Sequence, residues 1–585
     1  MEPSMQQRTR QLGFAGLGAM GFGMASNLLN AGFSVHGFDV NPAALAKFAE
    51  LGGSASSSVR EASSGQAKFF VMVATPEQVD SLVFGPGGLC DSLPSSPIVC
   101  LFSTLPPQYV KSLKSRIANS GRNDIRLVDC PVSGGAVGAR SGKLTIMIGC
   151  DGETVEEIRP ELEAISAPGR LFHTGPVGSA STLKMLNQHL AGIHIVAAAE
   201  TLAFAKCMGL SSRETHKILM NSNAASWIMG DRGVSMLNGD WSPKSAVSIF
   251  TKDLKIVTDA ADRLLLPCPL ASVAFQCFAE REASGHGRDD DASVVCNYEK
   301  LTGAKVEEPQ NDPSLVPLRD SSSEDTGPGI VLIVSDGAWA EKFRKEASLS
   351  GDAEESKLRV VHAQAEDLDK ALKSLPQGTF VGVTGFQDSL RRLSSQNPHL
   401  EFFDYHTEIA DGYTCKVLFT AKNDTFSAML EKALGPRFAI TQVRGSLGSA
   451  TAVALSMRLA SLIHVTAAAE CYALAAAEGV SPNLVYELIA GAAGSSAQFN
   501  KVMPRMIQGD FMPYPELGIT SLDDALRDLS AIKAQIQRIK FPGRLIDTAY
   551  QIFKKVHTDM NGQTASTAAL TSFWVSRGSI GSKLA

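Results

Sequence analysis

The first third of the chain alternates short apolar runs with segments that carry apolar residues at helical spacing. The runs have the length of buried strands, and segments such as 43–51 and 107–118 have the pattern of amphipathic helices. This alternation predicts a doubly wound parallel sheet, so we expect an α/β domain over residues 10–173. The expected strands are Leu12–Ala15, Ser34–Phe38, Phe69–Val73, Ile98–Phe102 and Arg126–Val128.

The pattern changes near residue 178. Long helical patterns rich in Ala, Leu and Met run to about residue 304, which predicts an all-helical domain over 174–304. Residues 305–328 are rich in Pro, Ser, Asp and Glu and poor in large apolar residues. This composition predicts a flexible linker, with a partner-binding motif as the alternative.

The alternation then starts again. A helix is expected at Ala338–Ala347 and a second long helical region from about 446 to 575. We therefore expect a second α/β-like domain over 329–440 and a second helical domain over 441–578. The strands expected in this part are Ile330–Val334, Thr379–Val383, Glu401–Tyr405 and Lys416–Thr420.

An internal repeat explains this second cycle. Val177–Glu200 matches Leu447–Glu470 at an offset of 270 residues without gaps, and the same offset relates Gly239-Asp240-Trp241 to Gly509-Asp510-Phe511. Lys252-Asp253-Leu254 matches Arg527-Asp528-Leu529 after a five-residue insertion. Two Ala-rich helices can match by chance, but the agreement on both sides of the helix favours a duplicated and degenerate unit.

Composition excludes several classes of protein. The net charge of -6 offers no basic surface for nucleic acid or anionic membrane. The ten cysteines lack metal-ligand spacing, so we expect reduced thiols in a cytoplasmic protein and no metal site. No apolar run approaches the roughly 18–20 residues of a membrane span, and we expect no secretory signal. Ala585 follows Ser582-Lys583-Leu584, which argues against a peroxisomal address.

A glycine-rich motif follows the first expected strand directly and opens a helix. Glycines in this context allow a tight turn and close approach of the backbone to a pyrophosphate at the helix N-terminus. Asp39 lies 21 residues beyond the second glycine, at the end of the next strand, where a carboxylate accepts hydrogen bonds from a ribose. Asp39 would repel a 2′-phosphate and no Arg follows closely, so we expect NAD rather than NADP. The expected cofactor-binding residues are Gly16, Leu17, Gly18, Ala19, Met20, Gly21 and Asp39.

With three further motifs, the chain resembles the β-hydroxyacid dehydrogenases, which include 3-hydroxyisobutyrate and 6-phosphogluconate dehydrogenases. The further motifs are Asp129–Gly135, Gly178–Gln188 and Lys252-Asp253-Leu254, and the resemblance covers residues 10–304 fully and 330–578 weakly. It implies an NAD-binding Rossmann domain followed by a helical domain like that of 6-phosphogluconate dehydrogenase. The enzyme class implied is an NAD-dependent oxidoreductase acting on a small hydroxy acid.

The motifs also make chemical sense individually. A hydroxyl and the backbone N–H groups at Ser133-Gly134-Gly135 are suited to a carboxylate, although an ordinary glycine-rich turn is the alternative. A lysine such as Lys184 in an apolar helix is usually a surface residue. The resemblance instead implies that it is catalytic, as general base during oxidation and general acid during reduction.

The resemblance implies further contacts. Gln188 lies one helical turn beyond Lys184, where the family commonly has Asn, so Asn187 is a second candidate for contacting substrate. Lys252 is expected near nicotinamide and substrate, with a surface pair with Asp253 as the alternative. The substrate-binding candidates are Ser133, Gly134, Gly135, Asn187, Gln188, Lys252 and Asp253, and the further cofactor-binding candidates are Val73, Ala74, Thr104 and Lys252.

The sequence indicates the substrate only as far as the branch of the family that the chain resembles. The segment Ser245–Leu254 and the residues after Gln188 resemble the branch that acts on four-carbon sugar acids, such as L-threonate dehydrogenases. We therefore expect a threonate-like acid, followed by 3-hydroxyisobutyrate or a semialdehyde. The contrasting class is a sensor or scaffold that binds NAD(H) without turnover. The presence of Lys184 favours the enzyme.

The second copy is expected to be catalytically inactive. The equivalent of Lys184 is Ala454, or Val453 in a register shifted by one residue, and the equivalent of Gln188 is Arg458. The glycine-rich motif is replaced by Val334-Ser335-Asp336-Gly337, and Asp129–Gly135 by Asp404–Ile409. We expect the second copy to be a covalently attached partner that forms an internal pseudo-dimer, with or without further self-association. A regulatory, metabolite-binding remnant is the alternative.

Overall fold

The computed structural model of the protein describes residues 10–310, 448–561 and 564–575. It also describes the strands and several short pieces between 330 and 446. Residues 10–310 are called the first unit below, and the described residues from 330 onward the second unit. The expected helix 338–347, residues 335–337 and most of the expected linker lie outside the described residues.

The first unit begins with a nine-stranded sheet in the order β3-β2-β1-β4-β5-β6-β8-β7, with β9 paired to β8. Its strands are β1 (Gln11–Ala15), β2 (Ser34–Phe38), β3 (Ser54–Ala55), β4 (Lys68–Val71), β5 (Ile98–Leu101), β6 (Arg126–Asp129), β7 (Val132–Ser133), β8 (Leu144–Gly149) and β9 (Ser166–Gly175). Its helices are α2 (Gly21–Asn30), α3 (Pro42–Glu50), α4 (Val59–Ser63), α5 (Pro76–Phe84), α6 (Leu89–Ser92), α7 (Pro107–Asn119), α8 (Gly135–Ser141) and α9 (Gly152–Ile165).

The sheet is the predicted doubly wound one, but one edge is not parallel. Strands β3 to β6 pair in parallel, whereas β8 pairs antiparallel with both β6 and β7. Between β7 and β8 the chain turns back through the short helix α8 instead of crossing over the sheet, so β8 must run in the opposite direction. The predicted doubly wound sheet is thus present, with an antiparallel strand added at this edge.

The helical domain of the first unit surrounds α10, which is buried along nearly its whole length. The first predicted linker residues belong to this domain. Val306 is buried, and the Glu308 carboxylate accepts hydrogen bonds from Lys206 Nζ at 2.6 Å and from the backbone N–H groups of Ser212 and Arg213. The predicted boundary at 304 thus lies too early. The helices are α10 (Ser179–Cys207), α11 (Ser212–Met220), α12 (Trp227–Asn238), α13 (Val247–Leu264), α14 (Pro269–Arg281) and α15 (Val295–Thr302).

The described part of the second unit repeats this plan. Its sheet has the order β11-β10-β12-β13-β14-β15 and is also mixed, since β13 pairs antiparallel with β14. The strands are β10 (Ile330–Val334), β11 (Leu358–His362), β12 (Phe380–Val383), β13 (Glu401–Ala410), β14 (Thr414–Thr420) and β15 (Phe438–Gln442). The helices are α20 (Ser449–Ala477), α21 (Pro482–Ile489), α22 (Ala497–Gln508), α23 (Leu522–Ile539), α24 (Arg544–Asp559) and α25 (Ser572–Val575).

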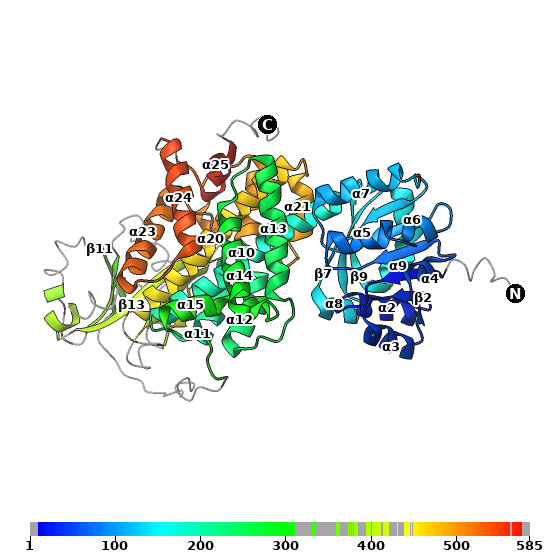
Figure 1. The fold of residues 1–585 in the computed structure, drawn as a ribbon. Helices are drawn as coiled ribbons and strands as arrows, with labels where there is room; N and C mark the ends of the chain where they lie inside the picture. The colour runs from blue at the N-terminus through cyan, green and yellow to red at the C-terminus, as the bar shows by residue number, and fades with distance from the viewer. Residues whose placement is uncertain are drawn as a thin grey trace.

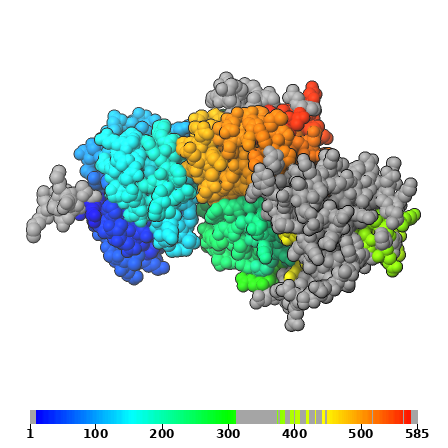
Figure 2. All heavy atoms as spheres, turned by 180° about the vertical axis from the view of Figure 1, so that it is seen from behind, coloured from blue at the N-terminus to red at the C-terminus, as the bar shows by residue number. Residues whose placement is uncertain are grey.

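The two sheets lie at opposite ends of the molecule, and the two helical domains pack together between them (Figure 1). Seen from behind, the second helical domain touches both the first α/β domain and the first helical domain (Figure 2). By length and composition α10 and α20 are apolar enough to cross a membrane, but 89% of the apolar window in each is buried inside the protein. They are core helices.

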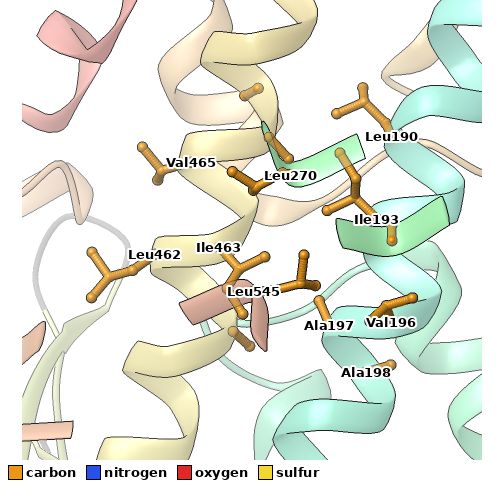
Figure 3. Close-up of a cluster of buried hydrophobic side chains, with 14 of the residues drawn as sticks. Leu190, Ile193, Val196, Ala197, Ala198, Leu270, Leu462, Ile463, Val465 and Leu545 are labelled. Atoms are coloured by element: carbon orange, nitrogen blue, oxygen red, sulfur yellow. The ribbon is translucent and has the colours of Figure 1, made fainter. Parts of the chain in front are cut away.

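The helices α10 and α20 pack against each other around a local two-fold relation. His194 and His464 are equivalent by the 270-residue offset, and their rings lie 4.4 Å apart between centroids. Because a residue that meets its own equivalent lies near the symmetry axis, the axis passes close to this pair. Figure 3 shows the surrounding apolar side chains, with Ile193 and Ile463 contributed by equivalent positions of the two helices.

Candidate active site between the α/β and helical domains

The loop after β1 has the geometry of a dinucleotide cradle. Gly16 has φ +94°, and a Cβ added there would lie 2.1 Å from the Met72 carbonyl oxygen. A Cβ on Gly21 would lie 1.8 Å from the Gly16 carbonyl oxygen, so both positions require glycine. A Cβ on Gly18, by contrast, meets none of the described atoms within 4 Å and would project into the cleft. This open space allows a ligand to approach the backbone.

The rest of the cradle also fits NAD. Helix α2 starts at this loop, and within residues 10–310 no side chain caps its N-terminus, although the Phe22 N–H donates to the Gly18 carbonyl at 3.0 Å. The positive end of the helix dipole therefore faces the cradle, where it favours a phosphate. Asp39, at the end of β2, accepts the Leu17 N–H at 2.6 Å and the Asn41 N–H at 2.8 Å, which leaves further lone pairs for a ribose. The Leu17 side chain packs into the core, so only its backbone belongs to the cradle.

A cleft of about 1650 Å³ joins this cradle to the helical domain. Of the predicted cofactor residues, all but Leu17 line it, and so do Ser133, Gly134, Gly135, Lys184, Gln188, Lys252 and Asp253. Asn187 does not line it, because it is fully buried. The structure therefore brings together the four separated motifs on which the family resemblance rests.

Lys184 is held by the start of α10. The Asp129 carboxylate, at the end of β6, accepts the backbone N–H groups of Gly178 and Ser181 at 3.1 and 2.7 Å and so fixes the helix to the sheet. Lys184 lies in the second turn of α10 and is only 6% exposed. Burial lowers the pKa of Lys184 to about 8. The negative charge of Asp253 acts in the opposite direction and raises this pKa, whereas the positive charge of Lys252 lowers it further.

A network of amides and charges orients this lysine. Lys184 Nζ donates to Gln188 Oε1 at 2.9 Å, and Gln188 Nε2 donates to Asp253 Oδ2 at 2.6 Å. Asn187 Nδ2 also donates to Gln188 Oε1, at 3.1 Å. Gln188, which is longer than the Asn common in the family, thus reaches both Lys184 and Asp253. The buried Asn187 donates a hydrogen bond to the same Gln188 amide.

Lys252 bridges the two domains. Its Nζ donates to the Thr104 carbonyl of the α/β domain at 3.1 Å and lies 3.2 Å from Asp253 Oδ1. Val73 and Ala74 follow β4, and the Val73 N–H donates to Ser103 Oγ at 3.0 Å, so this strand end is tied to the turn that carries Thr104. The pair Lys252–Asp253 is therefore part of the cleft and not a surface ion pair.

The Ser133–Gly135 turn faces Lys184 from the α/β side. Gly134 and Gly135 have φ values of +128° and +59°, which side chains disfavour, and a Cβ on Gly135 would lie 3.6 Å from the Lys244 carbonyl oxygen. Ser133 pairs with Thr145 across β7 and β8, and Thr145 Oγ1 accepts a hydrogen bond from Arg170 Nε at 3.1 Å. A hydroxyl, glycine backbone without side chains and a guanidinium therefore lie together, an arrangement suited to binding a carboxylate.

Sequence reasoning missed several residues that line the cleft. They are Lys143, Thr145, Arg170, Trp227, Asp231, Arg232, Lys244, Ile249, Gly491, Ala492 and Ala493, among others. Arg170 lies on β9, a strand that the apolar pattern did not reveal because only its first residue is fully buried. Gly491–Ala493 come from the second unit, roughly 300 residues away in sequence, and only the folded structure reveals them.

The second unit lacks the corresponding geometry. Asp404 caps α20 through Gly448 and Thr451 as Asp129 caps α10, but β13 continues to Ala410 where the first unit turns at its glycines. Ala454 stands in place of Lys184, and Arg458 pairs with Asp528 where Gln188 contacts Asp253. Among the described residues, no group of three or more His, Cys, Asp or Glu side chains is placed to hold a metal ion.

Comparison with family models gives two matches. The model of the NAD binding domain of 6-phosphogluconate dehydrogenase matches residues 11–175. The model described as the NAD-binding domain of NADP-dependent 3-hydroxyisobutyrate dehydrogenase matches twice, at residues 178–298 and 446–573. The first match covers the sheet that carries the glycine-rich loop, and the second covers both helical domains.

Curated relatives align with the first half of the chain. L-threonate dehydrogenase of Cupriavidus necator is 37% identical over 288 residues, covering 49% of this chain and 95% of that protein. 2-(Hydroxymethyl)glutarate dehydrogenase of Eubacterium barkeri is 30% identical over 301 residues, covering 51% and 98%. The crystal structure of 3-hydroxyisobutyrate dehydrogenase from Salmonella typhimurium is 32% identical, covers 49% of this chain and 99% of that one, and has a TM-score of 0.45.

Proposed function

Because the chain belongs to the β-hydroxyacid dehydrogenase family, we propose that its first unit transfers hydride between NAD and a small hydroxy acid. The observation that carries the proposal is the meeting of the glycine-rich cradle, the Ser133–Gly135 turn and Lys184 in one cleft. A sensor without turnover has no chemical need for a buried lysine between a nucleotide cradle and a carboxylate site.

The cradle is assigned to NAD. Gly16, Gly18 and Gly21 let the backbone approach the pyrophosphate, and Asp39 holds the ribose and repels a 2′-phosphate. When bound there, the cofactor supplies the hydride acceptor for oxidation of the substrate carbon. Thr104, Val73 and Ala74 form the wall along which the nucleotide lies, and Lys252 ties this wall to the helical domain.

Lys184 moves the proton. During oxidation its neutral amine accepts the proton of the substrate hydroxyl, and during reduction its ammonium returns it. With a pKa of about 8 roughly one tenth of the amine is neutral at pH 7, against about one in three thousand at the ordinary pKa. Because Gln188 Oε1 accepts one N–H of Lys184, the remaining positions on the nitrogen are directed toward the cleft.

The substrate proposed is a polyhydroxylated acid such as threonate. Its carboxylate would bind at Ser133–Gly135, next to the Arg170 guanidinium, and its hydroxyls would meet the amide of Gln188 and the charges of Lys252 and Asp253. The curated relatives named L-threonate dehydrogenase, at 32–37% identity, support this substrate class. 3-Hydroxyisobutyrate is the second choice.

We assign the second unit the role of an inactive, built-in partner. Ala454, the Arg458–Asp528 pair and the uninterrupted strand β13 leave no proton carrier or carboxylate turn at the equivalent place. The local two-fold packing of α10 on α20 supports the view that the internal pair replaces a dimer of separate chains. Abundant free cysteines suit a reducing compartment such as the cytoplasm.

The test is NADH formation by the full chain with L-threonate, D-threonate, D-erythronate, 3-hydroxyisobutyrate and glycerate, each with NAD and with NADP. Turnover of one acid with preference for NAD, abolished in Lys184→Ala, is the expected result. Tight NADH binding without turnover of any acid, in either direction, would replace the enzyme by the sensor.

A further inference from the structure

The connection between α21 and α22 (residues 490–496, called the α21–α22 loop) extends from the second unit into the active cleft. Gly491, Ala492 and Ala493 line the cleft beside residues of the first unit. The Gly491 carbonyl lies 3.4 Å from an Nη atom of Arg170, and the Ser495 carbonyl accepts the Trp227 N–H at 3.1 Å. The loop therefore contacts both domains that enclose the cleft.

One contact of this loop continues into the catalytic network. The Gly494 N–H donates to Asn187 Oδ1 at 3.1 Å, and both groups are buried. Since Oδ1 is occupied as acceptor, the Asn187 amide must point its Nδ2 toward Gln188, where it donates to Oε1. The same Oε1 accepts Lys184 Nζ. A backbone N–H of the second unit thus sets the orientation of an amide that adjoins the proposed proton carrier.

The loop approaches so closely that only glycine fits without adjustment. A Cβ on Gly494 would lie 3.0 Å from Leu190 Cβ, 3.1 Å from the Asn187 carbonyl oxygen and 3.2 Å from Asn187 Oδ1. These distances are shorter than ordinary van der Waals contact, so a side chain would push the loop away from α10.

The reverse contact, from the first unit to the second, is different. The equivalent of Gly494 is Ala224, in the α11–α12 loop (residues 221–226), and the equivalent of Asn187 is Met457, which has no amide. The Ala224 N–H donates instead to Ser222 Oγ of its own loop, at 3.1 Å. The purely structural contacts are kept in both directions, because Ala497 N–H donates to the Ala225 carbonyl as Trp227 N–H donates to that of Ser495.

From this asymmetry we infer that the α21–α22 loop is a positioning element of the first unit's active site, acting through the contact of Gly494 with Asn187. The inference rests on the proposed function and extends it, since it assigns the second unit a defined part in the reaction. The contact holds the Asn187 amide in the one orientation that places Gln188 Oε1 for Lys184, and the loop excludes water from this side of the cleft.

The experiment compares Gly494→Val with Ala224→Val in the full chain. Gly494→Val is expected to lower kcat about tenfold or more and to leave the Kd for NADH within about twofold. Displacing the loop admits water beside Lys184 and relieves the burial that lowers its pKa, so oxidation should become fast at a higher pH. Ala224→Val places the same side chain at the equivalent position, adding two methyl groups where Gly494→Val adds a whole isopropyl group, and is expected to keep kcat and the pH profile, even where it lowers Tm. Unchanged kinetics in Gly494→Val, or equal losses in both variants that follow Tm, would overturn the inference.

A double-mutant cycle guards against a simple packing defect. In an Asn187→Ala background, Gly494→Val should cost less than about twofold in kcat, because the contact is already absent. Additive effects would contradict the proposed relay.

If the wild-type chain oxidises none of the acids, the proposed function fails by itself. The inference is then tested by competitive acylation of Lys184 across pH, read by mass spectrometry. A midpoint that rises in Gly494→Val but not in Ala224→Val supports it, and equal midpoints refute it.

Discussion

Glu200 in the first unit and Glu470 in the second occupy equivalent positions, and each accepts two backbone N–H groups at the start of a helix in the other unit. Glu200 accepts the N–H groups of Leu545 and Ile546 at the start of α24, and Glu470 accepts those of Leu270 and Ala271 at the start of α14. Each carboxylate thus caps a helix of the other unit. These two helix caps are symmetric across the interface, although Glu200 also accepts the Tyr298 hydroxyl and Glu470 lies 2.9 Å from His189 Nε2.

The positions equivalent to the proposed active site differ between the two units. Lys184 and Ala454 are equivalent, yet one is a buried amine at a cleft and the other a small apolar residue of the core. Gln188 mediates between Lys184 and Asp253, whereas Arg458 neutralises Asp528 directly. The comparison teaches that the packing and the chemistry of two similar units can separate, because α20 keeps its apolar side chains and the capping Glu470 without keeping the lysine.

The largest expected effect tests the difference between Lys184 and Ala454 by removing the amine of Lys184. Lys184→Met keeps the apolar stem of the side chain but has no proton carrier, so kcat should fall about a thousandfold, within the range of general acid–base catalysis. NADH binding, followed by fluorescence, should stay within about twofold because the cradle is untouched. As the matched control, Ala454→Lys should confer no turnover on the Lys184→Met chain. Retention of more than about a tenth of kcat would remove Lys184 from the mechanism.

The next largest effect concerns the symmetric carboxylates. Glu200→Ala and Glu470→Ala each leave two buried N–H groups without an acceptor, so each should lower the free energy of unfolding by about 2–4 kcal/mol. Urea unfolding followed by circular dichroism measures both. A large loss in one variant and none in the other would show that the interface is symmetric in geometry only.

Glu200 adds a pH dependence. Burial raises the pKa of Glu200 to about 7 despite its hydrogen bonds, so the folded protein holds this proton more tightly than the unfolded chain does. The stability from this group is fully present below about pH 4.5 and is lost as the pH rises through 7. Glu200→Gln should flatten this part of the curve of Tm against pH.

Local patterns and motif spacing predicted much of the fold and part of the site. The strand–helix alternation and the glycines predicted the first sheet and its cradle, because turn geometry and apolar periodicity are local properties. The antiparallel edge at β8 and the docking of Glu308 were not predicted, because each depends on contacts distant in sequence. Burial of Asn187 and the approach of the α21–α22 loop depend likewise on how two long helices cross.

The pH profile sharpens the role of Lys184. Because burial lowers its pKa to about 8, kcat for oxidation should rise about tenfold per unit of pH below 8 and level off above, since the neutral amine is the base. Reduction needs the ammonium and should fall above pH 8. Steady-state rates in both directions with the same acid measure the two limbs. Profiles that run in parallel would assign the ionisation to another group.

The smallest expected effect lies in the second unit. Arg458→Gln restores the amide found at Gln188 but removes the cation that faces Asp528, whose pKa burial raises to about 6. We expect a loss of about 1–2 kcal/mol in stability, because a partly buried carboxylate loses its partner, and less than about a twofold change in kcat. Urea unfolding and steady-state kinetics on the same preparation separate the two quantities. A large loss of activity at unchanged stability would mean that the remnant cleft controls the active one, and the second unit would then be a regulator and not only a partner.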